Sequence, residues 1–84
     1  MSYIPPPSDL PKRFRGFQSA PAKTPFNGYG KLRKRWKDAK KRILEWDYMH
    51  GRFELYSAEG NHEGEFSLDG DQTRPAVRGR KVKP

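Results

Sequence analysis

The stretch LEWDYMHGRFELYSAEGNHEGEFSL, residues 44–68, alternates apolar and polar side chains around two sets of turn residues. Alternation with a period of two is typical of strands that bury one face of a sheet. His50 and Gly51 offer a two-residue turn, and Gly60 and Asn61 offer a second one. The stretch therefore predicts antiparallel strands joined by two consecutive hairpins.

These two turns define a register in which both hairpins bury the same face. The predicted pairs are Trp46 with Leu55 and Tyr48 with Phe53 in the first hairpin, and Leu55 with Phe66 and Phe53 with Leu68 in the second. Because side chains alternate, the opposite face carries Glu45, Asp47, Glu54, Tyr56 and Glu65. An acidic face of this kind is unexpected in a basic chain.

The predicted register places Asp47 directly across from Glu54, an arrangement that costs about 0.2–1 kcal/mol relative to neutral pairs. Two close carboxylates raise the pKa of one of them, which suits a general base, and His50 at the adjoining turn can supply an acid. The alternative is a surface network in which Arg52, Arg80 or other cations neutralise the acids. His62 falls on the other parity of its strand and is predicted to be a turn or edge residue.

The chain has 84 residues and a formal net charge of +8, distributed in three blocks. Residues 1–44 hold twelve Lys or Arg against two acids, residues 45–71 hold eight acids against Arg52 alone, and residues 72–84 hold five basic residues and no acid. Basic arms around an acidic island predict a polyanionic partner. Without cysteine and with only two histidines, we expect no disulfide, no metal site and no cofactor.

Six of the eight prolines lie within residues 1–25, and residues 1–30 show no sustained period of either kind. We predict an irregular, Pro-rich, basic N-terminal segment over residues 1–30, which the aromatic residues Phe14, Phe17, Phe26 and Tyr29 can attach to a sheet. The longest apolar pieces are only a few residues long, so we predict a soluble chain without a membrane span.

Residues 31–43, KLRKRWKDAKKRI, fit two interpretations. Leu32, Trp36, Ala39 and Ile43 recur at helical spacing, whereas the alternation around Trp36 and the pair Asp38-Ala39 fit a strand that turns into the next one. The expected fold is mainly β within the α+β class: a small, strongly twisted antiparallel sheet of about four strands, preceded by the irregular segment.

Taken together, the motifs resemble the cytotoxic domain of the ribosome-cleaving ribonuclease bacteriocins of the cloacin and colicin type. The resemblance rests on Glu45-Trp46-Asp47, His50-Gly51, Glu54 and Tyr56. It extends upstream to Arg33-x-Arg35-Trp36 and downstream to Gly60-x-His62-x-Gly64-x-Phe66, and covers roughly residues 33–83. It implies a ribonuclease domain over residues 31–84, and a strand and turn rather than a helix over residues 33–43.

Carried over residue by residue, the resemblance implies that Asp47, His50, Glu54 and Arg80 are catalytic, with Arg78 as a competitor for the place of Arg80. We expect Arg33, Arg35, Tyr56, Arg78, Lys81 and Lys83 to bind RNA, and Trp36 to stack on a base or, more in keeping with its pattern, to lie in the core. The chain departs from the family where Arg52 replaces an acid two residues after the histidine.

The implied activity is endoribonucleolytic, metal-independent cleavage of small-subunit ribosomal RNA at the decoding site. Glu54 would take the proton of a ribose 2′-hydroxyl, His50 would protonate the leaving 5′-oxygen, and Arg80 would stabilise the phosphoryl charge. The resemblance also implies an acidic immunity protein as partner, a monomer without membrane contact in its catalytic role, and secretion as part of a larger antimicrobial toxin that acts in the cytoplasm of the target cell.

Two other classes of function fit part of the pattern. A noncatalytic basic RNA-binding module would explain the arms and the aromatic residues, but it would not need paired acids beside a histidine. A metal-dependent DNase would want more histidine ligands than this chain has.

Overall fold

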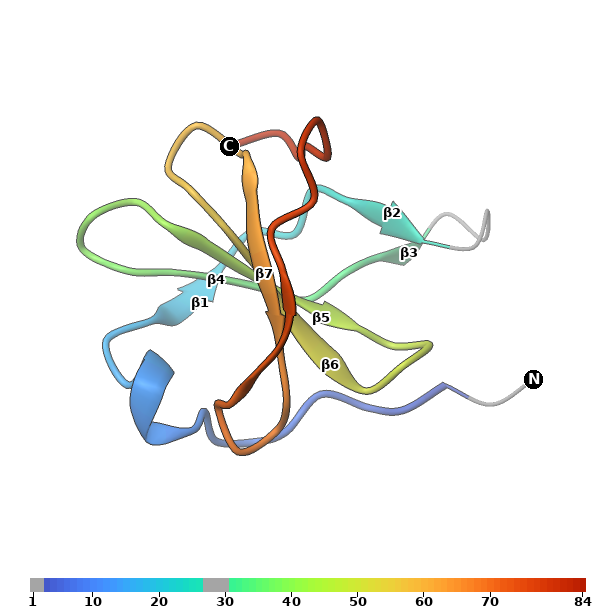
Figure 1. Cartoon of the computed structure of the whole chain (residues 1–84). Helices are drawn as coiled ribbons and strands as arrows, with labels where there is room; N and C mark the ends of the chain where they lie inside the picture. The colour runs from blue at the N-terminus through green and yellow to red at the C-terminus, as the bar shows by residue number, and fades with distance from the viewer. Residues whose placement is uncertain (1–2, 27–30) are drawn as a thin grey trace.

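The computed structural model describes residues 3–26 and 31–84, which form mainly antiparallel strands (Figure 1). The strands are β1 (Gln18–Ala20), β2 (Pro25–Phe26), β3 (Lys31–Leu32), β4 (Arg35–Lys37), β5 (Ile43–Asp47), β6 (Arg52–Tyr56), β7 (His62–Phe66) and β8 (Gln72–Pro75). Six of them form one sheet in the order β1-β4-β5-β6-β7-β8, and β2 pairs with β3.

The prediction of a mainly β, antiparallel fold is confirmed, whereas the expected four strands are too few, because the described residues form eight. The α+β class is not confirmed, because the described residues contain only one short 3-10 helix, η1 (Lys12–Phe14). Within these residues, no helix is long and apolar enough to cross a membrane.

Residues 31–43 form two short strands and a turn, so the helical alternative is wrong and the strand-and-turn prediction is confirmed. The turn forms because the Asp38 Oδ1 atom accepts hydrogen bonds from the backbone N–H groups of Lys40 at 3.0 Å and Arg42 at 2.9 Å. An Asp side chain that satisfies nearby N–H groups stabilises a turn at the expense of a helix. Trp36 on β4 lies in the core, as its pattern predicted.

The first hairpin has the predicted faces but not the predicted register. Trp46 pairs with Phe53, and Asp47 pairs with Arg52. The loop comprises residues 48–51 rather than two residues, because the Asp47 carboxylate accepts the N–H groups of Met49 and His50, and the Gly51 N–H donates to the Asp47 carbonyl. The register differs from the predicted one by two residues, which leaves every side chain on its expected face.

The second hairpin also departs from the predicted register, because its turn is longer than Gly60-Asn61. The Gly60 N–H donates to the Ser57 carbonyl, and Gly60 has a φ of +89°, typical of a type I turn closed by a glycine bulge. Phe53 therefore pairs with Phe66, and Leu68, predicted to be buried beside Phe53, is 51% exposed.

Strand β7 contains one extra residue. Leu55 pairs with Gly64 and Tyr56 pairs with His62, which leaves Glu63 without a partner of its own. This β-bulge moves His62 to the opposite face from the one that strict alternation would give it. The prediction that His62 is a turn or edge residue away from Glu54 is therefore wrong.

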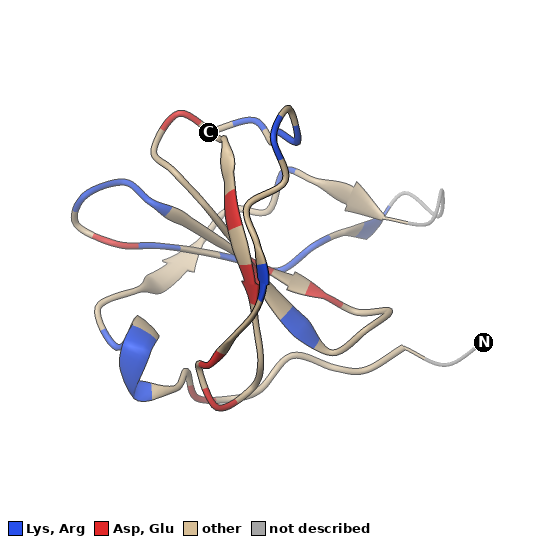
Figure 2. Cartoon of the chain, viewed as in Figure 1, with Lys and Arg blue, Asp and Glu red and all other residues tan. Residues whose placement is uncertain are grey.

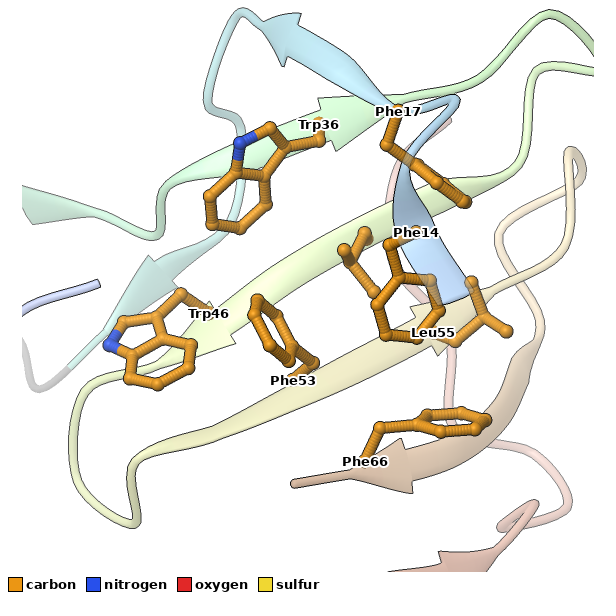
Figure 3. Packing of buried hydrophobic residues seen from close by; sticks show 8 residues of the cluster. Phe14, Phe17, Trp36, Trp46, Phe53, Leu55 and Phe66 are labelled. Carbon is orange, nitrogen blue, oxygen red and sulfur yellow. The ribbon is translucent and has the colours of Figure 1, made fainter. Parts of the chain in front are cut away.

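The core lies between the apolar face of the sheet and the N-terminal segment (Figure 3). The Phe14 ring, at the end of η1, contacts the rings of Phe53 at 5.5 Å, Phe66 at 5.2 Å and Phe17 at 5.5 Å between centroids. Burying each such side chain stabilises the fold by about 1.5–3 kcal/mol. Aromatic residues thus attach the N-terminal segment to the sheet, as predicted.

Of the other two predicted anchors, only Phe26 is among the described residues, and it lies near the β5–β6 loop. Phe26 stacks on Tyr48 with centroids 4.6 Å apart, and Tyr29 lies outside the described residues. The core includes residues on both sides of position 30. The division into a segment of residues 1–30 and a ribonuclease domain of residues 31–84 remains a prediction about where the activity resides.

Candidate active site

Three glutamates form a row across the face of the sheet opposite the core. Glu45 on β5 pairs with Glu54 on β6, which pairs in turn with Glu65 on β7. Figure 2 shows acidic residues on β5 and β7, and basic residues on β6, on η1 and on several of the surrounding loops. The predicted carboxylate pair thus exists with a different member, because Glu45 rather than Asp47 faces Glu54.

Each glutamate of the row is accompanied by an arginine from a different segment. The closest nitrogen–oxygen distances are 2.7 Å for Arg35 and Glu45, 3.4 Å for Arg80 and Glu54, and 3.7 Å for Arg74 and Glu65. These cations offset the repulsion between like charges on adjacent strands. The ion-pair network considered as an alternative is therefore present, and the acids that compose it include the predicted base.

Asp47 and His50 form a hydrogen-bonded pair at the end of β5. The His50 Nδ1 atom lies 2.7 Å from Asp47 Oδ2, and the imidazole is 69% exposed, so Nε2 is left for a ligand. Burial opposes ionisation of Asp47, but hydrogen bonds from His50 and Met49 and the charge of Arg33 outweigh it and lower the pKa of Asp47 below its ordinary value. Asp47 is therefore an anion at neutral pH that orients His50.

Glu54 lies one diagonal step from Asp47 on the neighbouring strand and is almost completely buried. Its Oε2 atom is 3.4 Å from Arg80 Nη2, and its Oε1 atom is 2.8 Å from His62 Nε2. Although partial burial opposes it, the neighbouring Tyr56 hydroxyl oxygen and the negative charge of Glu54 raise the pKa of Arg80, which keeps its charge at every accessible pH. The site thus combines a buried carboxylate, an exposed imidazole and a fixed cation.

The structure brings Arg80 rather than Arg78 to Glu54. Arg78 is exposed on the turn of residues 77–80, and Lys81 and Lys83 are exposed beyond it, where a polyanion can reach all three. Arg33 is half-buried, with Nη2 3.9 Å from Asp47 Oδ1.

The prediction that Arg35 and Tyr56 contact RNA does not fit their burial. Arg35 is 0% exposed and donates from Nε and Nη2 to Glu45 Oε2, so the charge that was predicted to hold a phosphate is used inside the protein. Tyr56 is 1% exposed and packs against the His62 ring at 5.3 Å. Burial, opposed in part by Arg80 and reinforced by Glu45 and Glu54, raises the pKa of Tyr56, which stays protonated.

Two cations that were not among the predicted RNA-binding residues lie beside His50. Arg52 and Arg74 line a polar groove of about 300 Å³ together with His50, Glu65 and Thr73. The departure of Arg52 from the family pattern was the feature of the sequence that could have indicated its role. Arg74 reaches the groove because β8 pairs with β7. Across the described residues, no three His, Asp or Glu side chains are grouped so as to hold a metal ion.

The comparisons with known proteins agree with the motifs. The family model named Cytotoxic matches residues 4–83. Cloacin from Escherichia coli is 42% identical to this chain over 64 residues, which cover 73% of this chain and 11% of cloacin. The chain thus spans about a tenth of the length of that relative. Because the family model matches nearly all of its residues, the chain belongs to the Cytotoxic family.

Proposed function

We propose that this chain is the nuclease domain of a bacteriocin-type toxin, and that it cleaves small-subunit ribosomal RNA at the decoding site by metal-independent attack of a ribose 2′-hydroxyl. The observation that carries the proposal is the pairing of a buried glutamate, held beside an arginine, with an exposed histidine held by an aspartate on the same face. Membership of the Cytotoxic family supports it.

In the proposed reaction Glu54 is the general base. It accepts the proton of the 2′-hydroxyl, and the resulting oxygen forms a bond to the adjacent phosphorus. The bond from phosphorus to the 5′-oxygen breaks, which leaves a 2′,3′-cyclic phosphate on one fragment. Arg80, whose Nη2 atom lies 3.4 Å from Glu54 Oε2, stands where it can stabilise charge on the phosphoryl oxygens.

His50 is the general acid that protonates the leaving 5′-oxygen. Its Nδ1 atom is engaged by Asp47, and its ring is mostly exposed, so Nε2 is available to the RNA. An imidazole oriented by a carboxylate through one nitrogen acts through the other. Arg33, Arg78, Lys81 and Lys83, together with Arg52 and Arg74 beside His50, supply cations for the RNA backbone.

A domain with this activity would be toxic to the cell that makes it. We propose a cognate acidic immunity protein that binds the basic surface, leaves Glu54 and His50 partly uncovered, and excludes the ribosome. Its binding should survive His50→Ala, whereas charge reversal at several basic residues of the arms should slow association. As part of a larger secreted toxin, the domain would act in the cytoplasm of the target cell.

The proposed function is tested with intact ribosomes and mapped RNA ends. Glu54→Gln and His50→Ala should each lower cleavage by about 10²–10⁴-fold, the usual effect of removing a general base or acid. Glu59→Gln is the matched control, because it makes the same chemical change on an exposed turn. Cleavage of a short RNA should persist in EDTA.

Other outcomes would identify another function. Loss of cleavage in EDTA would indicate a metal enzyme. Near-normal cleavage by a folded Glu54→Gln variant would show that Glu54 is not the general base. Binding of RNA without any cleavage would support the noncatalytic RNA-binding module instead.

A further inference from the structure

His62 is one of two histidines in the chain, and the proposed reaction does not use it. Its side chain is 1% exposed and lies on the acidic face because of the bulge at Glu63. Both ring nitrogens have partners: Nε2 lies 2.8 Å from Glu54 Oε1, and Nδ1 lies 2.9 Å from the backbone nitrogen of Val77. A buried imidazole with two partners is held in one orientation.

The second of these contacts determines the tautomer. The Val77 N–H can only donate, so Nδ1 of His62 must accept and carries no proton. A neutral imidazole then has its single proton on Nε2, which donates to Glu54 Oε1. A carboxylate has about four lone-pair sites, so this bond fixes Glu54 while its Oε2 atom remains able to accept a proton.

The backbone of His62 holds the segment that carries Arg80. Residues 77–80 form a turn in which the Arg80 N–H donates to the Val77 carbonyl and Gly79 has a φ of +87°, typical of a type II turn. The turn is attached at one end through the bond from Val77 to the ring of His62, and at the other through the His62 N–H, which donates to the Arg80 carbonyl at 2.9 Å.

We propose that His62 is a positioning residue that holds the base Glu54 and the cation Arg80 in one fixed geometry. The inference rests on the proposed function and adds to it, because the His62 ring contacts Glu54 Oε1 and leaves Oε2 to accept the proton. Other charged groups near Glu54 are Glu45 and Glu65 on the adjacent strands and Asp47 one diagonal step away, and none of the three forms a hydrogen bond to it among the described residues. His62 therefore supplies the only neutral donor described for the Glu54 carboxylate.

Two substitutions separate the two ring contacts. His62→Asn keeps an acceptor near the Nδ1 position for the Val77 N–H but cannot reach Glu54, whereas His62→Gln keeps a donor near the Nε2 position and loses the acceptor. Glu63→Gln, on the exposed bulge residue of the same strand, is the control. Unfolding by urea establishes that each variant is folded at the assay temperature.

We expect His62→Asn to lower kcat by about 10–100-fold with little change in KM, because the reacting groups lose alignment rather than affinity. The acidic limb of its pH–rate profile should move to higher pH, since a carboxylate that loses a donor holds its proton more tightly. His62→Gln should keep the wild-type limb with a smaller loss of rate. A folded His62→Asn variant with the wild-type rate and pH profile would overturn the proposal.

Nitrogen NMR of the imidazole provides a readout that does not depend on cleavage. In the wild-type protein Nε2 of His62 should carry the proton and Nδ1 should be an acceptor; a proton on Nδ1 would contradict the positioning role. If the wild-type protein cleaves no RNA while this tautomer is found and Glu54 titrates at higher pH in His62→Asn, the proposed reaction fails but the link between His62 and Glu54 stands.

Discussion

The buried ion pair between Arg35 and Glu45 should be more important for stability than any ion pair on the surface. Both side chains are 0% exposed, and Glu45 Oε2 accepts from Arg35 Nε at 3.0 Å, from Arg35 Nη2 at 2.7 Å and from the Thr24 hydroxyl at 2.6 Å. Arg35→Met would leave the Glu45 carboxylate buried without its cation. This change tests whether Arg35 is a structural residue rather than an RNA contact.

Removing one partner of a buried ion pair costs about 3–5 kcal/mol, because the remaining charge stays in a poorly solvated site. A domain of this size has roughly 5–15 kcal/mol of stability, and each kcal/mol shifts the unfolding temperature by about 4–8 °C. Arg35→Met should therefore lower that temperature by at least about 12 °C. Arg35→Met with Glu45→Leu should recover most of the loss, because no unpaired charge remains.

The assays are thermal unfolding and urea unfolding, each followed by the fluorescence of the two buried tryptophans, Trp36 and Trp46. Arg74→Met is the matched control, because its side chain is 77% exposed and lies 3.7 Å from Glu65. The control should lose no more than about 1 kcal/mol. An Arg35→Met variant that is as stable as this control, but binds RNA more weakly than the wild-type protein, would refute the reasoning.

The pKa of Asp47 in the folded state lies below its ordinary value of 3.8. Its contribution to the free energy of unfolding is therefore complete above that value and is lost as the pH falls through the folded-state pKa. Asp47→Asn should flatten acid unfolding between about pH 5 and pH 2. Gly60→Ala should destabilise the fold by at least about 1–3 kcal/mol in the same urea assay. Gly60 has a φ of +89°, and the added Cβ would lie 2.1 Å from the Val82 carbonyl oxygen. Gly16→Ala is the control: its Cβ would meet open space, so its stability should change by no more than about 0.5 kcal/mol. The logarithm of the Kd for RNA, measured by fluorescence anisotropy, should rise linearly with the logarithm of the salt concentration. A Kd that does not change with salt would contradict the role of the basic arms.

The alternating pattern of residues 44–68 predicted correctly which of the named strand residues face the core and which face the site, with the exception of His62. The register could not be predicted, because the loop lengths depend on hydrogen bonds of the Asp47 side chain and on the positive φ of Gly60. A displacement of two residues preserves the faces, so of the residues predicted to be apolar and buried only Leu68, which lies beyond the end of β7, is left exposed. The bulge at Glu63 does change the face, which is why His62 was misplaced.

The motifs selected Asp47, His50 and Glu54, and the structure places Asp47 beside His50 and Asp47 and Glu54 on one face. The sequence could not separate Arg80 from Arg78, since that choice depends on a turn held by tertiary contacts. Nor could it show that Arg35 is buried. A basic side chain is expected to be exposed unless an acid neutralises it, and the pairing of Arg35 with Glu45 on the neighbouring strand is known only from the structure.

The chemistry at the cut ends of the RNA tests the central claim most directly. Intact ribosomes are incubated with the wild-type domain and with Glu54→Gln, and both new termini are identified. Attack by the 2′-hydroxyl, with Glu54 as base and His50 as acid, predicts a single cut in small-subunit RNA that leaves a 2′,3′-cyclic phosphate and a 5′-hydroxyl, and almost no cut with Glu54→Gln. A 3′-hydroxyl with a 5′-phosphate, or equal cutting by Glu54→Gln, would contradict the account.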